Sequence, residues 1–153
     1  MFWSTAALTA VLIGAGAGGG WSNMEQPDIR GTWHAETYVL KDGTTLVVKG
    51  HIFFAAREWT VLFFIVDEAN QPASGSAEGG TYSQTGGEIL LRHFYHMSSE
   101  KAVAGPGASP FRLQIHDATS APSEACRVEV NGDRLTLRFP SGNAMLFRRG
   151  SGF

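Results

Sequence analysis

The sequence predicts an all-β fold, and three observations lead to it. Glycine occurs 19 times among the 153 residues and aromatic residues make up 11%, a composition that favours short strands and tight turns. C-terminal to residue 28, apolar and polar side chains alternate in short segments, as they do in strands with one buried face. Turn signals such as Asp42-Gly43 and Asn131-Gly132 separate these segments and predict hairpins.

The connections between the predicted strands are short, which decides how the strands are arranged. Nearly all are too short for a parallel crossover, so neighbouring strands are expected to be antiparallel. A long meander removes its exposed edges most simply by closing on itself. We therefore predict one domain, an antiparallel up-and-down β-barrel of about eight or nine strands. A two-sheet β-sandwich is the alternative.

Of the first three predicted strands, the first two alternate regularly and the third does not. Segment 29–40 places Trp33, Ala35, Thr37 and Val39 on its expected inner face, with His34, Glu36 and Tyr38 outside. Segment 44–55 alternates in the same way, and Gly50 in its middle indicates a bend or bulge. Segment 58–67 is apolar on both faces, which indicates either cover on both sides or one face exposed for a partner.

The remaining chain alternates turns with shorter strands. The polar, Pro- and Ser-containing stretch 68–78 predicts a loop, and 98–103 predicts one helical turn with a serine cap. A half-buried strand is expected where Phe111, Leu113 and Ile115 alternate with polar residues. The other strands are predicted at 79–84, 89–96, 126–130, 134–139 and 144–149.

Residues 1–24 differ from the rest and are left out of the predicted fold. They carry no charged side chain, and Ala15-Gly16-Ala17 has the small-x-small form of a signal-peptide cleavage site. However, the basic residues that begin a signal peptide are missing. The segment is also too short and Gly-rich to predict a stable membrane span.

An alternative is that translation starts at Met24, because the nucleotides of the codons just before it can form a purine-rich ribosome-binding site. A start there predicts a cytoplasmic protein, whereas a signal peptide predicts an exported one, periplasmic or secreted. In both cases the barrel domain is expected to occupy 25–153.

Charge and cysteine content exclude other classes. The net charge is -2 and no Lys/Arg cluster occurs, so the sequence lacks the electrostatic footprint of a nucleic-acid binder. The single cysteine, Cys126, excludes an intrachain disulfide. Cys126 alternates with Val128 and Val130, which predicts a buried small hydrophobe.

Two motifs, Gly31-Thr32-Trp33 and Phe147-Arg148-Arg149, give the chain a resemblance to a known family. With the hairpin meander between them, residues 29–149 resemble the uncharacterised bacterial lipocalin-like (calycin) domains. The resemblance implies that a basic residue of the last strand packs across Trp33 and closes the barrel floor. Gly31 is expected to be part of this closure. Arg148 and Arg149 point to opposite faces, and the pattern does not choose between them. The second lipocalin motif, around Thr-Asp-Tyr, is absent. The family implies a cavity but no particular ligand.

The predicted ligand-binding residues are cavity aromatics and two polar side chains. Aromatic candidates are Phe54, Trp59 and Phe63. His93 and Tyr95 share a strand face with Ile89 and Leu91, so an inward-facing Leu91 predicts both polar groups inside the cavity, where they can orient a ligand or move protons. His96 falls on the other face, and no third metal ligand is visible, so neither a metal nor a cofactor is expected.

These residues support three hypotheses. The first is a non-enzymatic binding protein that holds a small apolar molecule in the barrel. The second is a small cavity enzyme, such as a cyclase, isomerase or hydrolase, with His93 and Tyr95 as acid and base. The third is an interaction module in which strand 58–67 exposes Trp59, Phe63 and Phe64 together and pairs two copies as a homodimer.

Overall fold

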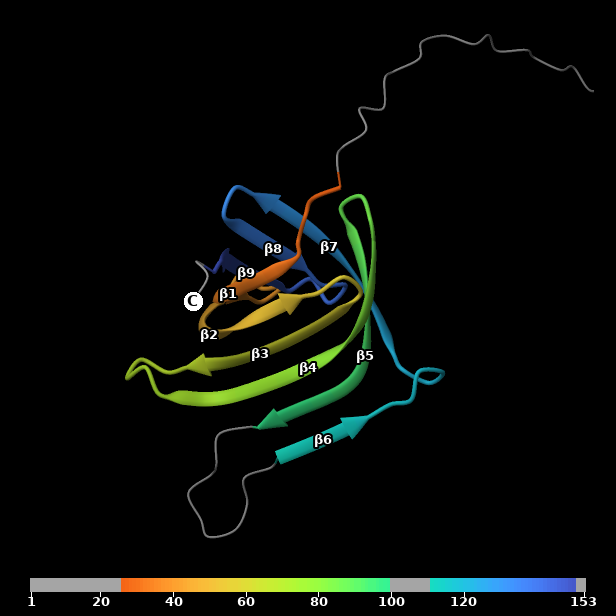
Figure 1. Ribbon diagram of the computed structural model, residues 1–153. Coiled ribbons are helices and arrows are strands. Elements are labelled where there is room, and N and C mark those ends of the chain that lie inside the picture. Colours follow the sequence, from red (N-terminus) through yellow and green to blue (C-terminus); the bar gives the residue numbers. More distant parts are fainter. Residues whose placement is uncertain (1–25, 100–110, 151–153) are drawn as a thin grey trace, which may run out of the picture.

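The computed structural model describes residues 26–99 and 111–150, and every regular element in these ranges is a β-strand (Figure 1). The strands are β1 (Gly31–Val39), β2 (Thr45–Phe54), β3 (Glu58–Val66), β4 (Pro72–Thr85), β5 (Glu88–Ser99), β6 (Phe111–Ile115), β7 (Ser123–Asn131), β8 (Arg134–Arg138) and β9 (Ala144–Arg149).

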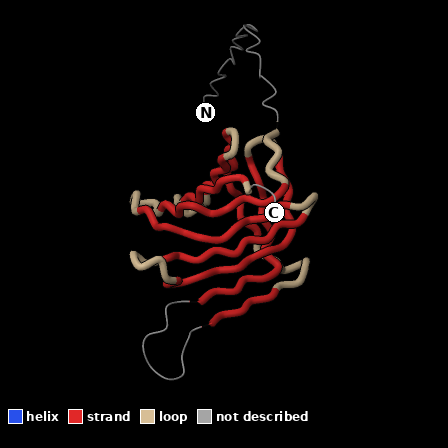
Figure 2. Tube along the Cα trace, turned by 60° about the vertical axis from the view of Figure 1, so that its left-hand side comes forward, coloured by secondary structure: helices blue, strands red, loops and turns tan. Residues whose placement is uncertain are grey.

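The sheet closes into a barrel. Its strand order is β4-β3-β2-β1-β9-β8-β7-β5-β6, and a further pairing of β4 with β5 joins the two sides (Figures 1 and 2). All nine pairings are antiparallel. Eight strands therefore form the ring, and β6 is an addition to it. The predicted all-β, up-and-down barrel is confirmed.

Strand β5 is shared between the barrel and the added strand. Its first part, Glu88–Arg92, pairs with β7, and its second part, Tyr95–Ser99, pairs with β6. Strand β6 is consequently not part of the ring. All five of its residues are exposed, with Ile115 at 75%, so the prediction of a half-buried strand is wrong.

Buried and exposed side chains alternate along β2, as the sequence predicts. Its Val48, Ile52 and Phe54 are buried, while Lys49 and His51 between them are exposed. The same pattern on the other strands gives one apolar core, and burial of this apolar surface is the main stabilising contribution. The largest fully buried side chains are Trp33, Phe54, Phe147, Ile29, Ile52, Ile89, Leu91, Leu135, Leu137 and Val48.

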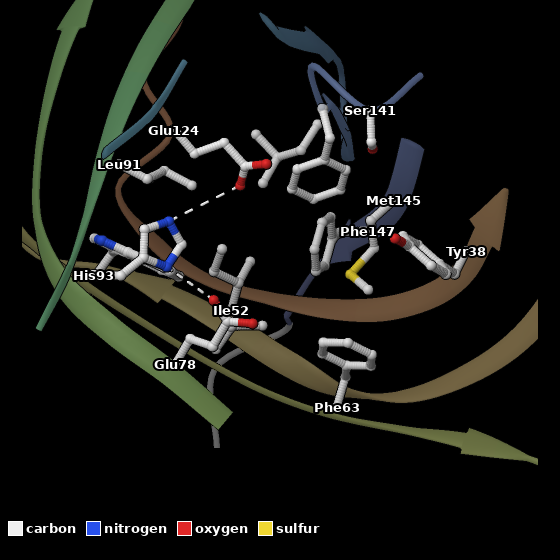
Figure 3. A pocket seen from close by; sticks show the side chains of 14 residues that line it. Tyr38, Ile52, Phe63, Glu78, Leu91, His93, Glu124, Ser141, Met145 and Phe147 are labelled. Atoms are coloured by element: carbon white, nitrogen blue, oxygen red, sulfur yellow. Dashed lines mark hydrogen bonds and ion pairs between the residues drawn. The ribbon is translucent and has the colours of Figure 1, made fainter. Parts of the chain in front are cut away.

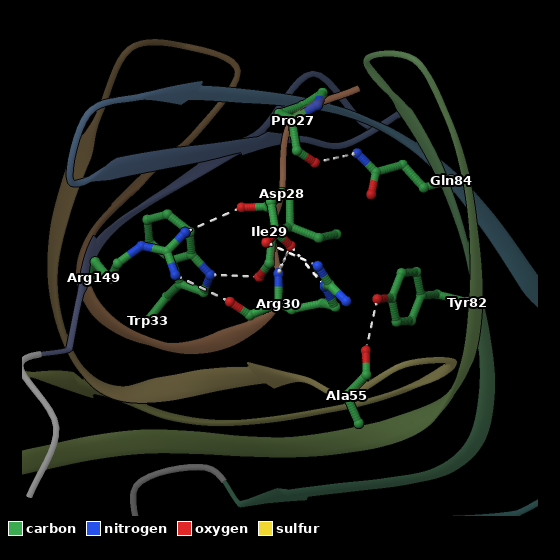
Figure 4. Close-up of polar contacts among 9 residues, drawn as sticks. All are labelled: Pro27, Asp28, Ile29, Arg30, Trp33, Ala55, Tyr82, Gln84 and Arg149. Carbon is green, nitrogen blue, oxygen red and sulfur yellow. Dashed lines mark hydrogen bonds and ion pairs between the residues drawn. The ribbon is translucent and has the colours of Figure 1, made fainter. Parts of the chain in front are cut away.

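One end of the barrel is closed around Trp33. Its indole Nε1 donates a hydrogen bond of 2.7 Å to the carbonyl oxygen of Ile29, and the guanidinium carbon of Arg149 lies 4.0 Å from its ring centroid (Figure 4). Arg149 also donates to the carbonyl oxygens of Arg30 and Asp28. Of the two candidate arginines, Arg149 thus covers the tryptophan.

The other candidate arginine points outward. Arg148 donates hydrogen bonds to the carboxylates of Glu36 (2.7 Å) and Asp133 (2.8 Å) on the barrel surface. Gly31, at the head of β1, has a φ of 102°, a conformation that suits glycine. A Cβ there would lie 3.6 Å from Arg149.

A bulge in β1 changes which side chains face inward. Ala35 pairs with Phe147 and Thr37 with Leu146 on β9, so Glu36 is an extra residue on β1. One extra residue moves all later side chains to the opposite face. Tyr38 therefore faces the interior, where it packs against the core, and its predicted outward position is wrong.

The bulge is matched on β2 by the predicted irregularity at Gly50. This residue has a φ of 135°, and a Cβ on it would overlap the carbonyl of Leu62 on β3. The pairing of β1 with β2 shifts between His34 and Thr37, opposite this glycine. Gly50 thus allows β2 to bend at the point where β1 bulges.

The predicted loop at 68–78 is largely strand. Strand β4 begins at Pro72, and only a tight hairpin turn separates it from β3. In that turn the Asp67 side chain accepts hydrogen bonds from the backbone nitrogens of Ala69 and Gln71. At the far end of β5, Ser98 and Ser99 are strand residues rather than the start of a helical turn.

Two predicted features lie outside the described residues. They are the alternative beginnings of the chain in 1–24 and the rest of the helical turn expected at 98–103. Within the described ranges, no helix is long and apolar enough to cross a membrane.

Candidate functional site

A cavity of about 220 Å³ lies inside the barrel (Figure 3), and Trp33 is not among the residues that line it. It extends toward Tyr38, near the end of β1, and Ser141, in the turn between β8 and β9. Its walls are mainly apolar and aromatic, with three titratable groups gathered on one side. The lining residues are Tyr38, Ile52, Trp59, Val61, Phe63, Glu78, Leu91, His93, Glu124, Leu137, Phe139, Ser141, Met145 and Phe147.

A bulge in β5 decides which polar residues enter this cavity. Gly79 pairs with Tyr95 and Gly80 with His93, so Phe94 is an extra residue. Before the bulge His93 faces inward, in step with buried Leu91. After it the faces are exchanged.

The exchange overturns the predicted pairing of His93 with Tyr95. The Tyr95 hydroxyl lies 2.7 Å from Thr60 Oγ1, in a shallow depression on the outside of β3 and β4. Its ring covers Gly79, where a Cβ would collide with it. His96, predicted on the opposite face from His93, instead lies on the same side, with its Nε2 3.8 Å from Glu78.

His93 is anchored by Glu78 of β4. Its Nδ1 lies 2.8 Å from Glu78 Oε2, and the side chains are 15% and 23% exposed. Ser76 donates a second hydrogen bond to Glu78, at 3.2 Å. Burial alone would raise the pKa of Glu78, but the hydrogen bond from His93 and the nearby histidines outweigh it, so the pKa lies below its usual value. Glu78 thus remains ionised and fixes the imidazole.

Glu124 of β7 lies on the other side of the imidazole. Its pairing with Leu91 directs it inward, and its Oε2 lies 3.9 Å from His93 Nε2 (Figure 3). This separation is too long for a hydrogen bond. Burial raises the pKa of Glu124, His93 opposes the rise, and the charge of Glu78 adds to it. The cavity therefore holds one carboxylate that ionises readily and one that resists ionisation, with an imidazole between them.

Two of the predicted aromatic residues form the cavity wall. Trp59 is 4% exposed, donates from Nε1 to the carbonyl oxygen of Arg92, and lies edge-on to His93 with 5.1 Å between ring centroids. Phe63 lies farther along, 6.3 Å from Tyr38 by the same measure. The edge-on contact between Trp59 and His93 is typical of packed rings.

The third predicted aromatic, Phe54, lies elsewhere in the core. It is fully buried and packs edge-on against Tyr82, with 5.2 Å between centroids, and it does not line the cavity. The prediction that strand 58–67 exposes its aromatic residues together, on which the interaction hypothesis depends, is also wrong. Trp59 and Phe63 face inward, whereas Phe64 is 38% exposed on the outer face.

Neither Glu78 nor Glu124 is among the residues that the sequence predicts for the site. Glu78 lies in the segment predicted as a loop, where no strand face can be assigned to it. Glu124 had a usable signal, since it stands two residues before Cys126 and the alternation of β7 continues to it. A single step further along that pattern places its carboxylate inside the barrel.

Other reactive groups contribute nothing to this site. No cluster of His, Cys, Asp and Glu in the described ranges is arranged to hold a metal ion. Cys126 is 2% exposed, and burial, followed by the effect of Glu124, raises the pKa of its thiol to about 12. A thiol in this state is a poor nucleophile at neutral pH.

Comparison with known proteins supports the architecture. No protein-family model and no curated protein matches the sequence. Among solved structures, a lipocalin-like protein from Bacteroides uniformis ATCC 8492 superposes with a TM-score of 0.50 and 19% sequence identity. The match covers 81% of this chain and 100% of that protein. The closed antiparallel barrel and this structural likeness together show that the chain has the lipocalin-like fold.

Proposed function

We propose that the protein binds a small, largely apolar molecule in the barrel cavity. The observation that carries this proposal is a cavity of about 220 Å³ left between aromatic walls. Small barrels either fill their interior with side chains or keep space for one small ligand. Here Trp33 and Arg149 close one end, and the space begins beyond them. Pockets for drug-sized ligands have volumes of roughly 300–1,000 Å³, so the ligand expected in this smaller cavity is compact.

The chemistry of the lining also supports a ligand site. Binding pockets are mostly apolar and contain a few placed polar groups that orient the ligand. Trp59, Phe63 and Val61 supply apolar wall, and His93 is a polar group whose ring is already held by Glu78. An imidazole fixed in advance orients a ligand without losing further side-chain entropy.

The test uses native mass spectrometry of the purified full chain together with binding of the neutral fluorophore N-phenylnaphthylamine. Val61→Phe, which adds a ring to the cavity wall, is expected to abolish fluorophore binding. Val47→Phe is the matched control, because Val47 is 59% exposed on the outer surface. The proposal is overturned if neither a co-purified molecule nor the fluorophore is bound, or if both variants bind the fluorophore like the wild type.

A second candidate function is proton transfer by His93. The favouring observation is that Glu78 accepts a hydrogen bond at His93 Nδ1 while Nε2 is directed toward Glu124. A carboxylate that fixes the tautomer leaves the other nitrogen as an available base. Glu78 takes the partner role that Tyr95, on the outer face, cannot fill.

A nitrobenzisoxazole probe tests this second candidate. Its ring opens when a base removes the carbon-bound proton and the N–O bond breaks, which gives a coloured cyanophenolate with no other reactant. Turnover above that of free imidazole is expected, with loss in His93→Gln and a partial loss in Glu78→Gln. Tyr95→Phe is the control that keeps wild-type turnover. Equal rates for wild type and His93→Gln end the hypothesis.

A further inference from the structure

We propose that the ligand of this cavity is a compact amine, in which a protonated nitrogen is attached to an aromatic or alicyclic body. The inference rests on the proposed binding function and specifies the chemical class of its ligand. It depends on three features: the sign of the charges in the cavity, the gap between two polar atoms, and the aromatic wall beside that gap.

None of the side chains that line the cavity carries a permanent positive charge. Glu78 and Glu124 contribute two carboxylates, and no lysine or arginine is among the lining residues of the described chain. With His93 neutral, these carboxylates are uncompensated, and even a protonated His93 offsets only one of them. The nearest additional base, His96, approaches Glu78 from outside the lining set. A cationic group is therefore favoured here and an anionic group is opposed.

The gap between His93 and Glu124 fits one hydrogen-bond donor. Their facing atoms, Nε2 and Oε2, are 3.9 Å apart and do not bond to each other. An ammonium nitrogen about 2.8 Å from each would satisfy both at once, because a charged donor prefers such distances. No described residue donates a hydrogen bond to Glu124, so this acceptor is available. Glu78, in contrast, already accepts from His93 and Ser76.

The aromatic wall completes the argument for an organic cation. The Trp59 ring lies 5.1 Å from the His93 ring, on the side of the cavity that holds the carboxylates. An indole face attracts ammonium groups, and this attraction grows when water is excluded. Phe63 and Tyr38, toward the other end, offer contact for an apolar body. A fatty acid would instead place a third carboxylate beside Glu78 and Glu124.

The test compares three compounds with one phenyl body: phenethylamine, phenethyl alcohol and hydrocinnamate. Isothermal titration of the wild-type protein at neutral pH is expected to rank the amine first, the alcohol second and the acid last. Glu124→Gln should weaken amine binding roughly tenfold to a hundredfold while leaving the alcohol unchanged. The control is Glu129→Gln, because Glu129 lies on the same strand but pairs with Arg138 on the surface. It should leave all three affinities unchanged.

The outcomes separate this inference from the function on which it rests. If the alcohol or the acid binds as tightly as the amine, the amine inference is overturned while the binding function stands. If none of the three binds and N-phenylnaphthylamine also fails, the binding function is overturned as well. The wild-type ranking needs no variant, so a folding defect in Glu124→Gln cannot obscure the result.

Discussion

The guanidinium of Arg149 lies 4.0 Å from the ring centroid of Trp33 and also donates to two carbonyl oxygens of the segment leading into β1. This contact joins the last strand to the first and closes one end of the barrel around a fully buried indole. The cavity lies beyond it, and its titratable groups come from β4, β5 and β7. The floor contact thus lies apart from the groups that would contact a ligand, so it can be altered without changing the cavity lining.

Removal of the floor contact should therefore destabilise the barrel without changing ligand affinity. Arg149→Ala loses a cation–π contact and two charge-assisted hydrogen bonds, and we expect a fall of about 1–3 kcal/mol in the free energy of unfolding. Urea titration followed by tryptophan fluorescence measures it. Arg148→Ala is the matched control, since its partners Glu36 and Asp133 lie on the surface, and it should unfold at nearly the wild-type urea concentration. Equal effects of the two substitutions would contradict this assignment.

The bend at Gly50 gives a second prediction. Any side chain there must adopt a φ of 135° and overlap the Leu62 carbonyl on the neighbouring strand. We expect Gly50→Ala to cost more than about 2 kcal/mol or to prevent folding. Gly87→Ala serves as control, because its φ is not in the left-handed region and a Cβ would lie 3.5 Å from its nearest neighbour. Thermal unfolding followed by circular dichroism distinguishes them, and similar melting temperatures would refute the steric argument.

Much of the fold could be predicted because the apolar alternation is regular. Strand β2 shows this, with Val48, Ile52 and Phe54 inside as expected. The first half of strand β4 could not be recognised, because its residues Pro72, Ala73, Ser74 and Gly75 have little intrinsic preference for strands. They form one because β3 offers a hydrogen-bonding edge along this stretch, and β5 adds a second edge from Gly75 onward.

The candidate site was harder to predict because two bulges move side chains between faces. An extra residue at Glu36 brings Tyr38 inside, and one at Phe94 sends Tyr95 outside. A bulge inserts a single residue and leaves the alternation on either side intact, so the sequence pattern carries little trace of it. The glycine pair Gly79-Gly80 opposite Phe94 was the available hint. A Cβ on Gly80 would overlap the Arg92 carbonyl.

The two cavity carboxylates should affect stability with opposite signs as the pH changes. The pKa of Glu78 is lowered in the folded protein, so its ionised form stabilises the fold above the ordinary glutamate range and this contribution is lost as the pH falls. Glu78→Gln should therefore be less stable than the wild type at about pH 7. The difference should shrink in acid. Urea midpoints measured at several pH values test this, and a deficit that does not depend on pH would argue against a charge effect.

Glu124 should show the reverse behaviour. Burial raises its pKa, so folding favours the protonated form, and the stability from that form is lost as the pH rises through the raised pKa. Glu124→Gln, which mimics the protonated side chain, is expected to equal or exceed the wild type in stability near pH 7. The gain should disappear below about pH 4, where both are neutral. A variant that is less stable at neutral pH would show that the Glu124 carboxylate is favourably paired in the free protein.

The buried thiol provides a last prediction, on access to the interior. The Cys126 side chain lies on the buried, inner face of β7, and burial raises the pKa of its thiol to about 12. The native protein should therefore react with Ellman's reagent only as fast as it unfolds, and urea should restore rapid labelling. The control places Arg127→Cys in a Cys126→Ala background, because residue 127 is exposed on the same strand. That variant should label at once. Rapid native labelling of Cys126 would mean that the barrel opens along β7, which would make the cavity accessible through its wall as well as its end.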